Sequence, residues 1–268
     1  MAIAVRSLGQ AGFRLELGEA VVYLDPYLSD SVEESEGPRF RRLVPRPMAP
    51  EQIDDADFVL LTHAHMDHCD PGTLPQLAEA SPLARFLGPA EVREALLDFG
   101  VDAGRILVPA EKWQALTPEL RVYPVPAAHP ELERDREGGA RCLGFVLDYV
   151  GNRDAGNRDA GNRDERRIYH AGDTSPCHEL IRVLRSLRPL HVGLIPVNEC
   201  SFFKERLGIV GNMTLREAFL LAEEIGVETL VPIHWDMFAP NSVSREEIEL
   251  LYGELAPPFE LSIDPVEL

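Results

Sequence analysis

The stretch FVLLTHAHMDHCD, residues 58–70, places an apolar run directly before three histidines and an aspartate. The chain holds only eight histidines in 268 residues, so three of them within six positions form a marked cluster. Residues two apart point the same way in an extended segment, so His63 and His65 can converge on one ion. Asp67 and His68 follow where the chain turns, and they can reach a second ion. Imidazole and carboxylate groups are ligands of zinc, manganese and iron, so the motif indicates a metal site.

Three more ligand-type residues stand at the ends of predicted strands. His129 ends the segment LRVYPVPAAH, Asp173 follows RRIYHAG, and His234 ends TLVPIH. Loops at the outgoing ends of strands meet in a shared crevice in many sheet proteins. We therefore expect these three side chains to lie near the histidine cluster.

The composition limits the class of protein and its partners. About 45% of the residues are hydrophobic, which is enough for a substantial core. The 26 basic and 45 acidic residues give a net charge of −19, which disfavours nucleic acid and anionic membranes as partners. No stretch reaches the roughly 18 apolar residues of a membrane span. The four cysteines form no C-x-x-C pair, so we expect a reducing, cytoplasmic location.

Hydrophobic periodicity predicts a chain with early strands and a later alternation of strands and helices. Two sheets with helices on the outside would satisfy both patterns within a single domain, residues 1–268. The predicted helices are 71–80, 89–100, 178–189, 214–226 and 244–255. The predicted strands are 3–9, 12–17, 20–26, 57–63, 85–89, 105–109, 120–129, 142–150, 166–174, 191–197 and 229–235.

The segment 151–165 contains the sequence GNRD three times with a period of five. This period is too short for a solenoid repeat, and the segment has no apolar residue larger than alanine. We interpret it as a mobile hairpin insert between two strands. A cation-binding role for its aspartates is the alternative.

The motifs together resemble the metallo-β-lactamase-fold hydrolase superfamily. HAHMDH resembles its signature, AGDT its later aspartate motif and PIHW its final histidine segment. The stretches DPYL, LGP, HAGDT, GNMTLREA and VPIHWDMF resemble in particular the ascorbate-6-phosphate lactonase branch. The resemblance implies an αββα sandwich, in which two mixed β-sheets are flanked by helices.

The resemblance also implies a dinuclear centre with divided ligand sets. Its two divalent ions would be zinc, manganese or iron, and Asp173 would bridge them. Asp67 and His234 would be the catalytic residues, with Asp67 as a proton shuttle. Because the second motif position is His65 and not glutamate, the resemblance favours hydrolysis over di-iron oxygen chemistry. The first ion would take His63, His65 and His129, and the second Asp67, His68 and His234.

Further residues are candidates for supporting the centre or holding a substrate. Asp25, after a predicted strand, is expected to orient a ligand histidine, with a turn-capping role as the alternative. An arginine-rich loop that includes Arg39, Arg41 and Arg42 could hold an anionic group, or it could be a solvated loop. A second candidate wall of the substrate site contains Asn198, Glu199 and Asn212. Trp235, which adjoins His234, is expected to line the pocket as well.

The leading hypothesis is a hydrolase whose hydroxide, activated between two metal ions, attacks a small ester or lactone. The substrate would be a small and anionic molecule if it is phosphorylated. A metal-dependent phosphodiesterase with nuclease-like action is the first alternative, and a non-catalytic metal-binding protein is the second. The sequence leaves the metal identity, the physiological substrate and the oligomeric state open.

Overall fold

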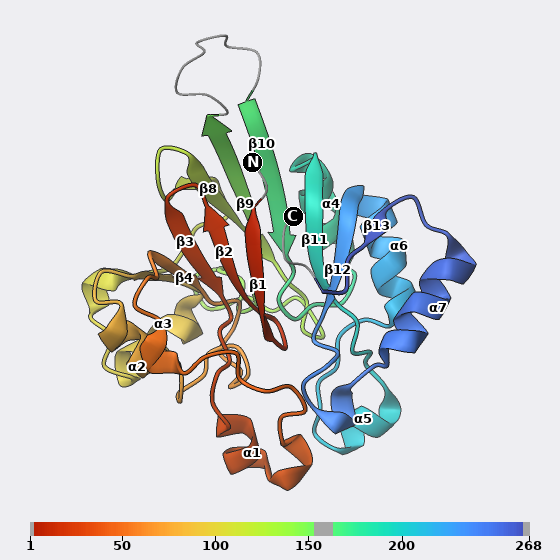
Figure 1. The fold of residues 1–268 in the computed structure, drawn as a ribbon, viewed down its shortest axis with the longest axis horizontal. Helices are drawn as coiled ribbons and strands as arrows, with labels where there is room; N and C mark the ends of the chain where they lie inside the picture. The colour runs from red at the N-terminus through yellow and green to blue at the C-terminus, as the bar shows by residue number, and fades with distance from the viewer. Residues whose placement is uncertain (1–2, 153–162, 265–268) are drawn as a thin grey trace.

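Two mixed β-sheets face each other in the computed structural model, which describes residues 3–152 and 163–264 (Figure 1). The first sheet has the order β1(Ala4–Gly9), β2(Gly12–Leu17), β3(Ala20–Leu24), β4(Phe58–Leu60), β5(Arg85–Leu87) and β6(Ile106–Leu107). The second has the order β13(Glu260–Leu261), β12(Val227–Ile233), β11(Leu190–Pro196), β10(Arg163–His170), β9(Leu143–Asn152), β8(Leu120–Pro126) and β7(Gln114–Ala115). In the first sheet, β1 to β3 are antiparallel and β3 to β6 are parallel. In the second sheet, β7 to β10 are antiparallel and β10 to β13 are parallel.

Helices cover the outer face of each sheet (Figure 1). α2 and α3 pack on the first sheet, and α4, α6 and α7 pack on the second. This arrangement confirms the predicted αββα sandwich. Among the described residues, no helix is both long and apolar enough to cross a membrane. The α-helices are α1(Ser31–Glu36), α2(Leu74–Ala80), α3(Ala90–Asp98), α4(His178–Ser186), α5(Phe202–Arg206), α6(Leu215–Ile225) and α7(Arg245–Leu255). The 3-10 turns are η1(Pro38–Phe40), η2(Pro50–Gln52), η3(Ala103–Arg105) and η4(Ala239–Asn241).

The main core lies between the two sheets. Phe13 and Leu15 of the first sheet and Phe145 and Leu147 of the second belong to one buried apolar cluster. Their i, i+2 spacing follows from the alternation of side chains in a strand, which sends every second residue to the same face. The alternation of apolar and polar residues in the sequence therefore identifies the residues on the inner faces of the sandwich.

Local signals in the sequence define the longer helices. Thr214 and Glu217 form a capping box before α6, since each side chain accepts a hydrogen bond from the other residue's backbone N–H. Gly226 ends α6 in the left-handed conformation, with φ of +68°. The helix α6 consequently runs where the sequence predicted it.

Strand direction brings one end of each sheet to the same edge of the sandwich. β3 and β4 run parallel, and β8, β10 and β12 share one direction in the other sheet. The backbone N–H of Leu143 donates to the carbonyl of Thr62, which joins the sheets at this edge. Gly172, with φ of +59°, approaches Thr62 so closely that a Cβ would lie 2.7 Å from its side chain. Only glycine fits this junction without strain.

The region 28–50 differs from the sequence-based expectation, and part of the predicted insert lies outside the described residues. The region 28–50, which reads as irregular, contains the six-residue helix α1 and the turn η1. Such short elements show too little periodicity to be recognised from the sequence. Of the predicted insert 151–165, residues 153–162 lie outside the described residues, and the flanking residues belong to the antiparallel pair β9 and β10.

Replacing Phe145 with alanine should lower the free energy of unfolding by about 3–5 kcal/mol, because the ring is fully buried between the sheets. Urea denaturation monitored by circular dichroism measures this change. Leu83→Ala is the matched control, since this side chain is 89% exposed and its loss should change the value by less than about 0.5 kcal/mol. Equal effects of the two substitutions would contradict the assigned core.

Candidate metal centre

Two buried histidines are held by a hydrogen-bond chain that begins at Asp25. The Asp25 carboxylate accepts hydrogen bonds from the backbone N–H and the hydroxyl of Thr62, at 2.8 and 2.7 Å. Nδ1–H of His68 donates to the same carboxylate at 2.7 Å. Because the only hydroxyl proton of Thr62 is used, its oxygen accepts from Nδ1 of His63 at 3.0 Å. Both rings are therefore held through Nδ1 and turn Nε2 toward the candidate centre, which is how outer partners orient ligand histidines.

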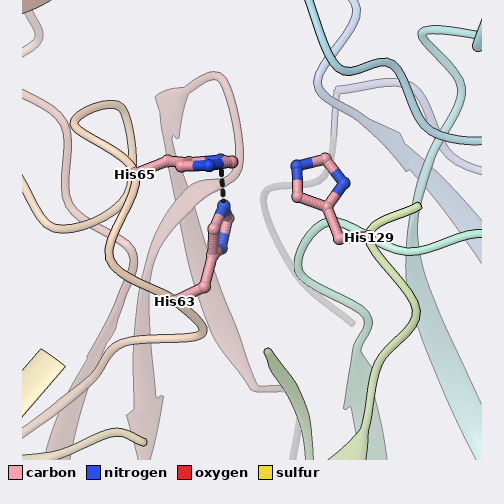
Figure 2. Close-up of side chains that lie close together, drawn as sticks. All are labelled: His63, His65 and His129. Carbon is pink, nitrogen blue, oxygen red and sulfur yellow. Dashed lines mark hydrogen bonds between the residues drawn. The ribbon is translucent and has the colours of Figure 1, made fainter. Parts of the chain in front are cut away.

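A group of three histidines comes from two loops that face each other (Figure 2). Nε2 of His63 lies 2.9 Å from Nδ1 of His65, and the His129 ring stands across from both. One nitrogen of each ring lies within 4.8 Å of the others. Burial lowers the pKa of His63, assisted by His68, and it also lowers that of His129. Both rings are therefore neutral near pH 7, as metal ligation requires.

A second group joins the motif to the ends of β10 and β12. Nε2 of His234 lies 3.2 Å from Oδ2 of Asp67 and 3.3 Å from Oδ2 of Asp173. Oδ1 of Asp173 lies 3.2 Å from Nε2 of His68, and its Oδ2 lies 3.5 Å from Nε2 of His129. Asp173 thus contacts members of both predicted ligand sets, the position expected of a bridging carboxylate.

These separations fit metal ions. Two atoms bound at about 2.0–2.1 Å to one tetrahedral ion lie roughly 3.3–3.4 Å apart, close to the distances between these histidines and carboxylates. Nε2 of His68, both ring nitrogens of His129 and Oδ1 of Asp173 are buried and lack a hydrogen-bond partner within the described residues. A buried polar atom without a partner is costly, and bound cations would satisfy Nε2 of His68, one ring nitrogen of His129 and Oδ1 of Asp173.

The charges of the centre also favour cations. Burial lowers the pKa of His68, but the carboxylates of Asp173, Asp67 and Asp25 outweigh it and raise that pKa well above its usual value. Burial likewise lowers the pKa of His234, yet Asp173 and Asp67 raise it to about 9. Burial raises the pKa of the Asp67 and Asp173 carboxyls, but the two histidines hold both well below the usual range. Protons on His68 and His234 supply the positive charge that balances the carboxylates, and bound metal ions can take the place of these protons.

The centre opens onto a cavity of about 450 Å³. His65, Asp67, Asp173 and His234 lie in its wall. A structural metal site is closed by its protein ligands, whereas a catalytic site keeps access for substrate. The exposure of four of the seven predicted ligands to one cavity is therefore the arrangement of a reactive centre.

Two residues of the centre carry no recognisable signal in the sequence. Nε2 of Gln10 donates to Oδ2 of Asp67 at 2.7 Å and lies 3.0 Å from Nε2 of His234. The amide nitrogen of Asn241 lies 3.4 Å from Nδ1 of the same histidine. Gln10 occupies the turn between β1 and β2, far from every motif. Only the packing of β1 beside the end of β12 could identify it.

The predicted arginines lie in different surroundings. Arg39 lines the cavity, and its Nη2 donates to the carbonyl of Leu207 at 3.0 Å. Arg41 is exposed and pairs with Glu33. Arg42 is half-buried and donates to the carbonyl of Tyr27 at 2.9 Å. Among the described residues, only the first of the three reaches the cavity.

The second candidate wall also lies away from the cavity. Asn198 and Asn212 are buried and hydrogen-bonded to each other at 2.8 Å, and Glu199 stands half-exposed beside them. The indole N–H of Trp235 donates to the carbonyl of Pro232, and this ring lines a separate hollow of about 160 Å³. None of the four lines the cavity among the described residues.

Facing mixed sheets covered by helices, with histidines and aspartates at their strand ends, define the metallo-β-lactamase fold. A family model of the β-lactamase superfamily domain matches residues 21–235, so the chain belongs to this superfamily. The predicted superfamily is confirmed, and the lactonase branch stays a prediction.

Relatives and solved structures extend the similarity over nearly the whole chain. A metal-dependent hydrolase of Pyrococcus abyssi is 26% identical over 95% of this chain and 94% of its own length. Igni18, a metallo hydrolase of Ignicoccus hospitalis, is 18% identical with a TM-score of 0.68, covering 100% of this chain and 97% of its own. An isothiocyanate hydrolase from gut bacteria of Delia radicum is 19% identical with a TM-score of 0.71 and the same coverage. The two solved structures support the fold.

Metal affinity should rise as the pH approaches about 9, because a cation must displace the proton that His234 carries below its pKa. Titration calorimetry with Zn²⁺, buffered by a competing chelator, measures the affinity. Repeating it in two buffers of different ionisation enthalpy measures the released protons. An affinity independent of pH, with no proton release, would contradict this charge balance.

Asp25→Asn should weaken metal binding by about 10–100-fold, because the amide orients His68 and Thr62 less well than the carboxylate. Asp70→Asn is a matched control. Its carboxylate is equally buried but accepts hydrogen bonds from Ser29, Ser31 and Thr73. Competition with a fluorescent zinc indicator compares the two variants. The orienting role would be disproved by equal losses of affinity.

Proposed function

We propose that this protein is a metal-dependent hydrolase that cleaves a carboxylic ester or lactone. The observation that carries the proposal is the opening of a histidine and aspartate cluster, with ligand-like separations, onto a cavity. Curated relatives from three Pyrococcus species, each 26% identical over 95% of this chain, carry the name metal-dependent hydrolase. These names support the reaction class.

Two groups of residues would hold two divalent ions, with Asp173 between them. The first group is His63, His65 and His129, and the second is Asp67, His68 and His234. Bound there, the ions would acidify a water molecule and polarise the carbonyl oxygen of the substrate. Zinc, manganese and iron all suit imidazole and carboxylate ligands.

The protein's own groups would place the reactants and move the proton. Asp67 and His234 line the cavity, and Gln10 donates to the Asp67 carboxylate. Asp67 stays ionised at neutral pH, because His68 and His234 outweigh the effect of burial and hold its carboxyl pKa well below the usual range. It is therefore suited to accept a proton from water in the cavity. The free thiols of all four cysteines accord with a cytoplasmic location for this chemistry.

Chelation should abolish hydrolysis of the best substrate, and added Zn²⁺, Mn²⁺ or Fe²⁺ should restore it. Elemental analysis of the purified protein identifies the resident metal. A panel of lactones, aryl esters and bis-aryl phosphates, assayed side by side, tests the reaction class. Turnover of only the phosphates would replace our proposal with a phosphodiesterase, and turnover that survives chelation would refute metal dependence.

Asp173→Ala should lower kcat by at least about 100-fold, because it removes the carboxylate shared by both candidate groups. His178→Ala is the control, since this exposed histidine stands at the start of α4. Steady-state kinetics and metal content per chain are measured for both. Unchanged metal content and kcat in the Asp173 variant would rule out the bridging role.

A further inference from the structure

The cavity above the candidate centre has walls from separate parts of the chain. α1 and η1 form one side, and the loop 207–210 after α5 forms the other. α1 and α5 lie at the same end of the molecule, beyond the sheets (Figure 1). Phe238 and Asn241, after β12, complete the wall. The position of the cavity makes it the place where a substrate would contact the centre.

Much of the cavity wall is apolar. Val32, Phe40, Ile209 and Phe238 line the cavity and belong to one buried hydrophobic cluster. The rings of Phe40 and Phe238 meet edge to face, with centroids 5.8 Å apart. Aromatic packing of this kind is rigid and offers contact area without hydrogen-bonding groups.

The rim continues this apolar surface to the solvent. Met66, Leu207 and Val210 line the cavity and are 39%, 47% and 42% exposed. Scattered exposed apolar residues are common, but these three line a single cavity beside a polar centre. Ligand sites typically combine such apolar walls with a few polar groups that fix orientation.

Charge is nearly balanced in this lining. Apart from the candidate metal ligands, its charged residues are Glu36 and Arg39, which have opposite sign. Arg39 already donates to a backbone carbonyl of the opposite wall. Recognition of a phosphate group usually uses several converging donors, which this lining does not supply among the described residues.

We propose that the substrate carries an uncharged alkyl or aryl group next to the scissile carbonyl, and that this group occupies the cavity. The inference rests on the proposed hydrolase function and specifies its substrate class. The sequence suggested a phosphorylated substrate, whereas the lining of the cavity favours a substrate with an apolar group.

A series of p-nitrophenyl esters from acetate to hexanoate tests the proposal on the metal-loaded protein. Each added methylene that enters the cavity should raise kcat/KM by about threefold to fourfold. Val210→Lys should reduce kcat/KM for the hexanoate more than for the acetate, since it places a charge on the rim. Leu250→Lys, at an exposed position on α7, should leave both values unchanged. A constant kcat/KM along the series, or a preference for a phosphorylated ester over its neutral analogue, would overturn the proposal.

Calorimetry separates this inference from the hydrolase proposal. If no ester is turned over, binding of acetamide and hexanamide to the metal-loaded protein still reports on the cavity. If hexanamide binds more tightly than acetamide, and Val210→Lys but not Leu250→Lys reduces this binding, the result would support an apolar ligand even though the proposed reaction class is wrong. Equal or undetectable binding of both amides would refute the apolar site itself.

Discussion

The balance of charge at the shared edge of the two sheets is the constraint on which the site depends. Asp25, Asp67 and Asp173 bring three carboxylates into a largely buried space, where an uncompensated negative charge is very costly. His68 and His234 compensate them, and each is attached to a different sheet. The network therefore couples the chemistry of the site to the docking of the sheets.

The β-sandwich positions the candidate metal ligands, and the loops around the cavity would determine substrate specificity. The histidines and aspartates lie in loops that directly follow strands, and paired strands and the junction between Gly172 and Thr62 fix the starts of these loops. Segments without regular sheet structure surround the cavity above them. Function on a rigid scaffold with variable loops is a common solution, because loops can change without loss of the core.

The parts of the fold and site that depend on local pattern could be predicted from the sequence. Alternating residues identified the inner faces of strands, and the H-x-H-x-D-H spacing identified side chains that the structure brings together with His129, Asp173 and His234. Their metal-binding role stays a prediction. Gln10 could not be found, because its place depends on how β1 packs beside β12. The helical form of α1 and η1 was also missed, since these elements are too short to show a period, although Arg39 of η1 was a candidate for the substrate site.

The apolar cluster beside the cavity joins pieces of chain that are far apart in sequence. Tyr27, Phe40, Ile209 and Phe238 meet in one small cluster that contains none of the candidate ligands. Substitutions in this cluster can reshape the space offered to a ligand while the seven histidines and aspartates stay in the loops that follow the strands. Related enzymes could thus acquire different substrate specificities through a few substitutions in this cluster. Protein engineering could change the specificity there without altering the candidate metal ligands.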